Sequence, residues 1–234
     1  MDIVIYIYNG ITALDAIGPY EVLSKLPNAN VKFVGETKGV IVSDNHFLKL
    51  VAEYDITEIQ KADILLVPGA VIGFLRESKK SNVKEWIKKI HATTQWTLSV
   101  CSGAIILAAA GILQGRNATS HWGVIHLLKD YGANPTLKRF VREDKIITSQ
   151  GVSAGIDMSL YLASQIVGEE AAKSYQLIIE YFPEPPLNFK SYNEATPQIM
   201  SMAKETMAID VKKDLSILDL VKNLQSLIKI KKGK

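Results

Sequence analysis

The sequence of 234 residues contains a single cysteine, Cys101, so no disulfide can form within one chain. No apolar run approaches the ~20 residues that span a bilayer, and the N-terminus lacks the basic and small-residue features of a signal peptide. Gly-rich phosphate loops are absent, and the histidines form no metal-ligand motif. We therefore expect a cytoplasmic protein with no membrane segment, no metal and no cofactor.

An excess of charge of one sign is also missing. The formal net charge is +3, and three lysines lie among the last four residues, Lys231, Lys232 and Lys234. Without this tail the chain is close to neutral, and no basic stripe follows any predicted element. Binding to nucleic acid leaves such a stripe on a folded face. We therefore expect no nucleic-acid partner.

Short β-rich runs alternate with helical patterns along most of the chain. Continuous apolar strands that alternate with helices are typical of a parallel sheet covered on both faces. The pattern thus predicts an α/β protein, a flavodoxin-like three-layer sandwich with a mostly parallel central sheet. Gly18-Pro19 is expected to open the first helix. Strands are expected at 3–8, 31–34, 40–42, 63–67 and 96–100, a hairpin at 136–142 and 145–149, and later helices at 82–91, 102–110, 122–131, 154–167 and 170–181.

A helical pattern continues from about residue 196 to the end. We expect an α/β domain over residues 1–195 and a C-terminal helical extension over 196–234, which is too short for an independent DNA-binding domain. The extension is interpreted as a helix packed on the body or on a partner subunit, with a membrane-surface helix as the alternative. Two apolar stripes are compatible with it: Leu215, Leu218, Val221 and Leu224, or Ile217, Leu220, Leu224 and Leu227.

The most informative stretch surrounds Cys101, where a strand ends at Val100 and a helix begins at or after Ser102. Ser99 and Gly103 flank the cysteine as the glycines flank the serine in a nucleophile elbow. Such a turn presents its side chain at the carboxyl end of the sheet, where open α/β sheets bind ligands. The partial positive charge of the helix N-terminus should lower the thiol pKa below its ordinary value. The pattern equally allows an inert, buried cysteine.

Two further segments follow the carboxyl ends of predicted strands. Asp15 is expected in the loop after the first strand, where a neighbouring thiolate would raise its pKa and make it a proton donor; an N-cap or solvated loop residue is the alternative. Backbone N–H groups of Gly69 and Ala70, after the strand ending at Val67, are candidate oxyanion donors facing the cysteine. An ordinary turn explains their spacing equally well.

Taken in this order, these segments resemble the ThiJ/PfpI superfamily, which is related to class I glutamine amidotransferases, over nearly the whole chain. Within the superfamily the sequence is most similar to the isonitrile hydratases. The resemblance is carried by LDAIGP at 14–19, SVCSG at 99–103, AAGILQG at 109–115, ATSHW at 118–122, AGID at 154–157 and EYFPEPP at 180–186.

The resemblance implies that Cys101 is the catalytic nucleophile and Asp15 the essential acidic residue. Ser102 stands where the family has an essential threonine, so the hydroxyl is kept and the methyl is lost. The resemblance implies a catalytic role for Ser102, which would orient Asp15 or hold the thiolate. Ser102 also stands where protease-like members carry a histidine, which disfavours a peptidase. His121 matches a histidine near the site of several relatives, either in a chemical role or as a pocket residue. Gly103 completes the expected site.

The resemblance further implies a cofactor-independent lyase that hydrates a small-molecule isonitrile to an N-substituted formamide. Cys101 would attack the isonitrile carbon, and Asp15 would act as acid and then as base. One alternative is a glyoxalase- or deglycase-like activity towards α-oxoaldehydes. The other is a non-enzymatic redox sensor or regulatory module in which Cys101 is oxidised. Relatives form homodimers, so a homodimer is expected.

Overall fold

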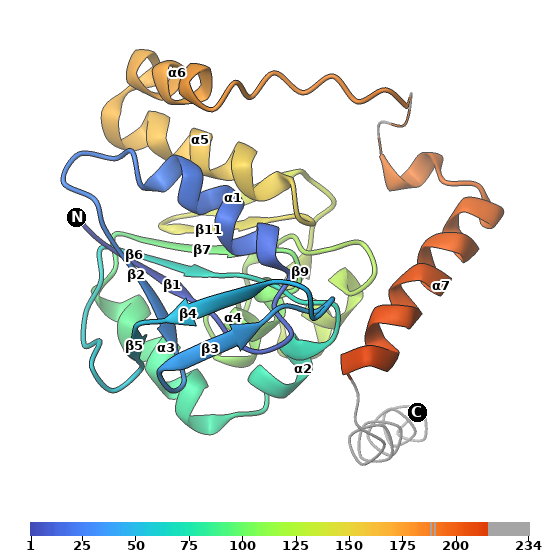
Figure 1. Cartoon of the computed structure of the whole chain (residues 1–234), viewed down its shortest axis with the longest axis horizontal. Coiled ribbons are helices and arrows are strands. Elements are labelled where there is room, and N and C mark those ends of the chain that lie inside the picture. The colour runs from blue at the N-terminus through green and yellow to red at the C-terminus, as the bar shows by residue number, and fades with distance from the viewer. Residues whose placement is uncertain (188, 190, 215–234) are drawn as a thin grey trace.

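The protein is described by a computed structural model that covers residues 1–187, 189 and 191–214. Seven strands form the main sheet, in which every neighbouring pair is parallel except the antiparallel pair at one edge (Figure 1). In spatial order they are β10 (Phe140–Glu143), β11 (Ile146–Ser149), β7 (Trp96–Val100), β6 (Ile64–Val67), β1 (Asp2–Tyr6), β2 (Asn30–Gly35) and β5 (Tyr54–Asp55). The predicted flavodoxin-like α/β sandwich is therefore confirmed.

Helices cover both faces of this sheet, and alternate residues of each strand point to opposite faces. Ile3 and Ile5 of β1 face one layer, whereas Val4 and Tyr6 face the other. The core on each face of the sheet is apolar, which explains why the central strands are uninterrupted hydrophobic runs in the sequence. The first layer holds α1 (Ala13–Leu23), α5 (Ala154–Val167) and α6 (Glu169–Ile178); the second holds α2 (Gly73–Glu77), α3 (Ser81–Thr93), α4 (Gly103–Ala109) and the 3₁₀ helix η1 (Ile125–Tyr131).

Two small sheets lie outside the main one. A hairpin of β3 (Gly39–Val42) and β4 (Lys49–Ala52) is antiparallel, and β8 (Asn117–Ala118) pairs with β9 (Asn134–Pro135) in parallel. Of these short strands only β3 was expected from the sequence. The others, like β5 and α2, span two to five residues, too few for a hydrophobic period to emerge.

The first helix begins at Ala13 rather than at Pro19, so that prediction is wrong. Thr12 precedes the helix in an extended conformation, and Pro19 occupies its seventh position. Proline normally disfavours a helical residue before it because its ring meets the Cβ of that residue. The preceding residue is Gly18, which has no Cβ, so the helix continues through the proline. A second difference is at 122–131, where only the 3₁₀ helix η1 forms.

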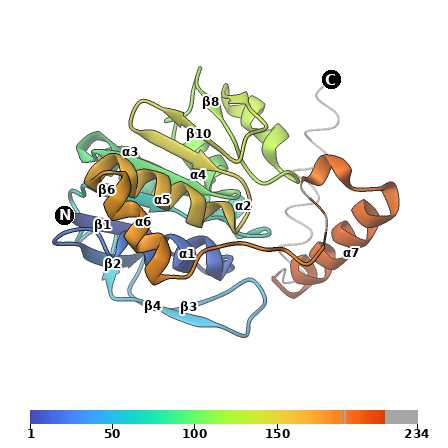
Figure 2. The same cartoon turned by 90° about the horizontal axis from the view of Figure 1, so that it is seen from above.

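The C-terminal segment leaves the sandwich after α6. A 3₁₀ turn, η2 (Tyr192–Glu194), precedes α7 (Pro197–Asp214), which lies beside the body (Figures 1 and 2). The start of α7 agrees with the predicted helical extension, whereas both predicted apolar stripes fall outside the described residues. Among the described residues, no helix has the length and hydropathy needed to cross a membrane.

Candidate active site

Cys101 follows the last residue of β7 and has a left-handed backbone, with φ of 59°. A non-glycine residue rarely adopts this conformation unless its surroundings hold it there. Here the Cys101 N–H donates to the carbonyl of Gln150 at 3.0 Å, and its carbonyl accepts from Ser120 Oγ at 2.8 Å. The turn therefore has the strained form expected of a nucleophile elbow.

Two glycines make the close packing around this turn possible. A Cβ on Gly103, the first residue of α4, would lie 2.0 Å from the Val67 carbonyl oxygen. A Cβ on Gly69 would lie 2.6 Å from Ser102 N and 2.8 Å from the Cys101 Cβ. Both contacts are shorter than van der Waals packing allows, so both positions need glycine. Gly103 thus acts by permitting close packing and does not line the cavity beside Cys101.

Asp15 lies in the first turn of α1, not in the preceding loop as predicted, and its side chain is 0 % exposed. Its Oδ2 accepts from the Gly69 N–H at 3.1 Å, whereas Oδ1 has no hydrogen-bond partner. Burial raises the pKa of this carboxyl to about 7, against the smaller opposing effects of Gly69 and of the Cys101 thiol. The nearby carboxylate of Asp44 raises it further. The sequence prediction of a raised pKa holds, but burial is the main cause.

The expectation of a lowered thiol pKa is wrong. Burial raises the pKa of Cys101 well above its ordinary value, and the negative charge of Asp15 adds to the effect. The backbone N–H groups of Ser102 and Val152 favour the thiolate and act in the opposite direction. Because Asp15 and Cys101 interact closely, they lose their two protons in two steps, and the pKa of each step belongs to the pair and not to either residue alone.

Ser102 has a different partner from the one expected. Its Oγ donates to the Ala70 carbonyl at 2.7 Å and accepts from the Ala70 N–H at 2.9 Å. The hydroxyl therefore holds the loop after β6 rather than Asp15 or the thiolate. The same contact occupies the Ala70 N–H, and Asp15 occupies the Gly69 N–H. The two predicted oxyanion donors are thus engaged in positioning other site residues.

His121 lines the same cavity as Cys101. Its Nδ1 accepts from the Gly123 N–H at 3.2 Å, which assigns the proton of the neutral ring to Nε2. Burial lowers the pKa of His121, so the ring is neutral at pH 7. The ring packs against Gly151, where a Cβ would lie 2.5 Å from its Cδ2. The structure therefore brings His121 to the site as a neutral residue.

The cavity above Cys101 has a volume of about 190 Å³. Part of its wall is polar, because Thr12 Oγ1 donates to Asp44 Oδ2 at 2.5 Å beside it. Sequence reasoning missed six residues that line it: Thr12, Asp44, Val71, Val124, Val152 and Met207. Val152 had a detectable signal, because the small-residue loop before α5 follows the strand next to β7. The others come from loops and from α7, whose place over the site depends on the tertiary fold.

Metal chemistry receives no support from side-chain clusters. Within the described ranges, no group of three or more His, Cys, Asp or Glu is arranged to hold a metal ion. The strand order reverses between β1 and β6, and Asp15, Gly69 and Cys101 follow β1, β6 and β7 at this switch point. Such crevices are where open α/β sheets bind ligands. The arrangement offers a sulfur nucleophile, a buried proton donor and a small cavity.

Comparisons with known proteins agree with this geometry. Residues 1–165 match the model of the DJ-1/PfpI family. Isonitrile hydratase of Pseudomonas putida is 36 % identical over 200 residues, which are 85 % of this chain and 86 % of that protein. The glutathione-independent glyoxalase DJ-1 of Schizosaccharomyces pombe is 23 % identical over 71 % of this chain and 91 % of its own. A crystal structure of a ThiJ/PfpI family protein from Pseudomonas syringae superposes with a TM-score of 0.84 at 32 % identity, covering 91 % of this chain and 88 % of that one.

Proposed function

The chain belongs to the DJ-1/PfpI family, and from this premise we propose that it is a cofactor-independent isonitrile hydratase, a lyase that converts R–N≡C and water into R–NH–CHO. The proposal is supported by its similarity to the Pseudomonas putida isonitrile hydratase over most of both chains. One observation carries it: a cysteine in a strained left-handed turn shares a cavity wall with neutral His121 and lies, like the buried Asp15 carboxyl, against Gly69.

In the first step, the Cys101 sulfur forms a bond to the terminal carbon of the isonitrile. The attacking species is the thiolate, which is present when the shared proton resides on Asp15. Asp15 then gives that proton to the same carbon, and the product is a thioimidate, R–N=CH–S. A carboxyl whose pKa is about 7 is a suitable acid at neutral pH.

In the second step, water adds to the thioimidate carbon. The Asp15 carboxylate accepts a proton from the water and passes it to the nitrogen, giving R–NH–CH(OH)–S. Collapse of this intermediate breaks the carbon–sulfur bond while Asp15 accepts the hydroxyl proton, which releases the formamide and restores the thiolate beside a protonated carboxyl. Asp15 thus acts first as acid and then as base, and the N–H groups of Ser102 and Val152 stabilise the departing sulfur anion.

The test is to incubate the purified protein with cyclohexyl isonitrile and to measure N-cyclohexylformamide by chromatography. We expect turnover by the wild type, none by Cys101→Ala, and a loss of about 10²-fold or more for Asp15→Asn, since the acid and base are then missing. Circular dichroism controls for folding. Absence of formamide with the wild type, or formation by Cys101→Ala, would contradict the proposal.

A glyoxalase activity is the second candidate, favoured by the similarity to the Schizosaccharomyces pombe glyoxalase. Cys101 would add to the aldehyde carbon of an α-oxoaldehyde to form a hemithioacetal. A proton would then move between the two carbons, and hydrolysis of the resulting thioester would release the hydroxy acid. Lactate production from methylglyoxal, measured beside the isonitrile assay, distinguishes the two activities. If both are absent while mild peroxide converts Cys101 to a sulfinate, a redox sensor is the better description.

A further inference from the structure

One wall of the reaction cavity comes from outside the α/β sandwich. Met207 of α7 lines the cavity together with Val71 and Val124. Thr12, Asp44 and the Cys101 turn line the same cavity. A ligand bonded to Cys101 therefore lies in a cavity whose wall includes apolar side chains, one of them from α7.

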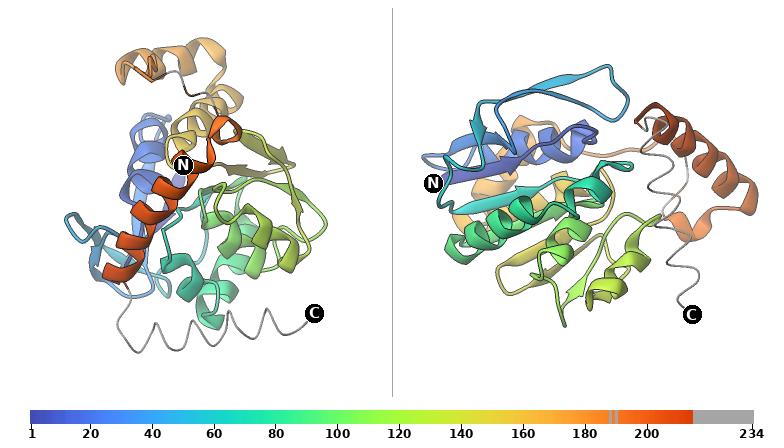
Figure 3. Two further views of the ribbon diagram at one scale, coloured as in Figure 1. Left: turned by 90° about the vertical axis from the view of Figure 1, so that its right-hand side faces the viewer. Right: turned by 90° about the horizontal axis from the view of Figure 1, so that it is seen from below.

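The surface on which α7 packs lies next to His121. Trp122 stacks on Tyr192 with ring centroids 6.4 Å apart, and a second hollow between body and helix is lined by Trp122, Tyr192 and Met200. The left view of Figure 3 shows α7 running across the front of the body. The helix thus docks on the segment that carries His121.

The packing of α7 is light. Met200, Ala203 and Met207 lie three and four residues apart and are half-buried, as expected for one face of a helix. Within the described part of α7, no side chain is fully buried. Met202, on another face of the helix, is 60 % exposed. Few buried contacts allow a segment to open at low cost in free energy, and methionine adapts its shape to its neighbours.

We propose that α7 is the movable outer wall of the reaction cavity, and that Met207 limits the size of the apolar group that a substrate can carry. The assignment deepens the proposed function and rests on it. An apolar cavity of about 150 Å³ accommodates benzene. The cavity of about 190 Å³ beneath Met207 therefore suits a single ring or a compact branched alkyl group.

The kinetic test compares methyl, cyclohexyl and benzhydryl isonitrile with three variants. Met207→Ala should raise kcat/KM for benzhydryl isonitrile by ~10-fold relative to methyl isonitrile, since pocket size discriminates by about this factor per methylene. Met207→Trp should lower kcat/KM for cyclohexyl isonitrile and spare methyl isonitrile. The matched control is Met202→Ala, which shortens the same residue type on the outer face and should behave as wild type. Equal effects of Met202→Ala and Met207→Ala would overturn the proposal.

A second measurement does not depend on the proposed function. Because Cys101 is the only cysteine, mass spectrometry follows its alkylation without ambiguity. Met207→Ala should accelerate labelling by the bulky N-pyrenylmaleimide at least several-fold more than labelling by iodoacetamide, and Met202→Ala should change neither rate. If Met207→Ala changes the ratio of the two labelling rates but no isonitrile is hydrated, α7 is the cavity wall and the proposed activity is refuted. If the ratio does not respond to Met207→Ala, the wall is refuted, whatever the activity.

Discussion

At the scale of single residues, burial controls the chemistry of the site. Cys101 is 6 % exposed and Asp15 is 0 % exposed, and the loss of water raises the pKa of both. An anion on one group also disfavours an anion on the other. The raised pKa of the thiol favours the proton on Cys101 in the resting site, so the thiolate forms when this proton passes to Asp15. This arrangement suits a reaction that needs a thiolate and a proton donor at the same time.

The buried carboxyl predicts a pH-dependent stability. The pKa of Asp15 is about 7 in the folded protein and near 3.8 in the unfolded chain, so the folded state binds the proton more tightly. Stability therefore falls as pH rises from about 4 to about 7, and the loss is complete above pH 7. Three pKa units correspond to roughly 4 kcal/mol. Asp15→Asn, which cannot ionise, should gain about this much over the wild type between pH 4 and pH 8.

Urea unfolding of both proteins at pH 4, 6 and 8 measures this difference, and groups common to the two cancel. His121, whose pKa is lowered by burial, is one such group. A difference in the free energy of unfolding that stays constant with pH would show that Asp15 has an ordinary pKa in the folded protein. The side-chain amide introduced by Asp15→Asn retains an acceptor for the Gly69 N–H, so the contact itself is preserved.

The two central residues of the site, Cys101 and Asp15, could be predicted at this scale, but the direction of the pKa shift of Cys101 could not. Small residues around Cys101 indicate a sharp turn, and the motif around Asp15 carries a resemblance that places the two together. The pKa of Cys101 depends on how completely it is covered. That cover includes His121, Val152 and Met207, which are 20 to 106 residues away in the sequence. Residue patterns describe neighbours along the chain and not the distant residues that exclude water.

At the scale of elements, long periodic segments were predictable and short ones were not. The strand at 96–100 and the helix at 154–167 were predicted with the bounds that the structure has. The helix has 14 residues, enough for its hydrophobic pattern to emerge, and the strand alternates apolar and polar residues along its whole length. The early start of α1 was missed because Pro19 normally marks a first turn. Gly18 has no Cβ to meet the proline ring, and it packs closely against Ile156 of α5, so the helix continues through Pro19.

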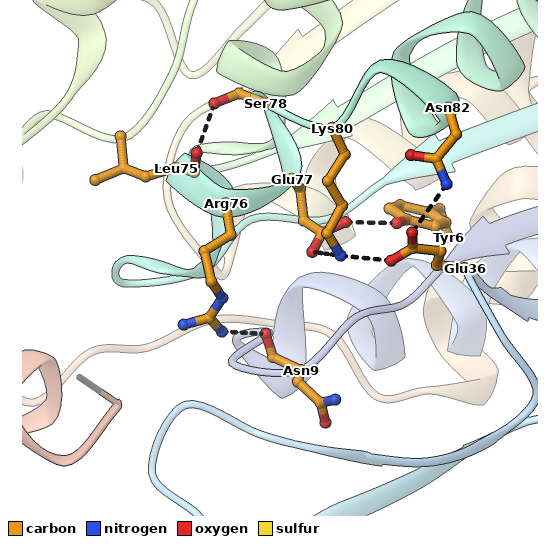
Figure 4. Close-up of polar contacts among 9 residues, drawn as sticks. All are labelled: Tyr6, Asn9, Glu36, Leu75, Arg76, Glu77, Ser78, Lys80 and Asn82. Carbon is orange, nitrogen blue, oxygen red and sulfur yellow. Dashed lines mark hydrogen bonds and ion pairs between the residues drawn. The ribbon is translucent and has the colours of Figure 1, made fainter. Parts of the chain in front are cut away.

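The short helix α2 is tied to the sheet by a buried carboxylate. Glu77 is 3 % exposed and accepts from Tyr6 of β1 at 2.6 Å and from Lys80 at 2.8 Å (Figure 4). Lys80 also reaches Glu36 after β2, at 2.6 Å. Burial raises the pKa of Tyr6 well above its usual range, and the charge of Glu77 raises it further. The phenol therefore stays a donor, and the network links α2 and the start of α3 to two strands.

Glu77→Gln tests this link. The amide offers one acceptor where the carboxylate offered two, so a buried donor loses its charge-assisted partner at a cost of roughly 1–3 kcal/mol in the free energy of unfolding. The matched control is Glu58→Gln, because Glu58 pairs with Lys38 at 2.7 Å on the surface. Exposed ion pairs contribute little to stability because water and salt screen them. Urea unfolding at pH 7 compares the variants, and equal losses would mean that the buried network does not hold α2.

At the scale of the whole molecule, one stretch of the chain exposes several large apolar side chains. It comprises the end of α6 and the segment that follows, and we name it the α6 edge: Leu177, Ile178, Phe182, Leu187 and Phe189. Exposed apolar side chains that gather on a surface are typical of interaction sites. A second group lies on the β3–β4 hairpin, which exposes Val40, Phe47, Leu48 and Val51. Val40 and Val51 are cross-strand neighbours.

We expect two copies of the chain to associate through the α6 edge, because a symmetric pair covers the same apolar patch on both subunits. Light scattering should then give about twice the chain mass of 25.8 kDa. Leu177→Glu with Ile178→Glu introduces charges at positions that are 64 % and 65 % exposed, so the fold tolerates them while the contact does not. This double variant should elute as a monomer, whereas Val40→Lys with Val51→Lys should remain a dimer. A monomeric wild type would refute the association. If the hairpin variant is monomeric and the α6-edge variant remains a dimer, the interface lies on the β3–β4 hairpin instead.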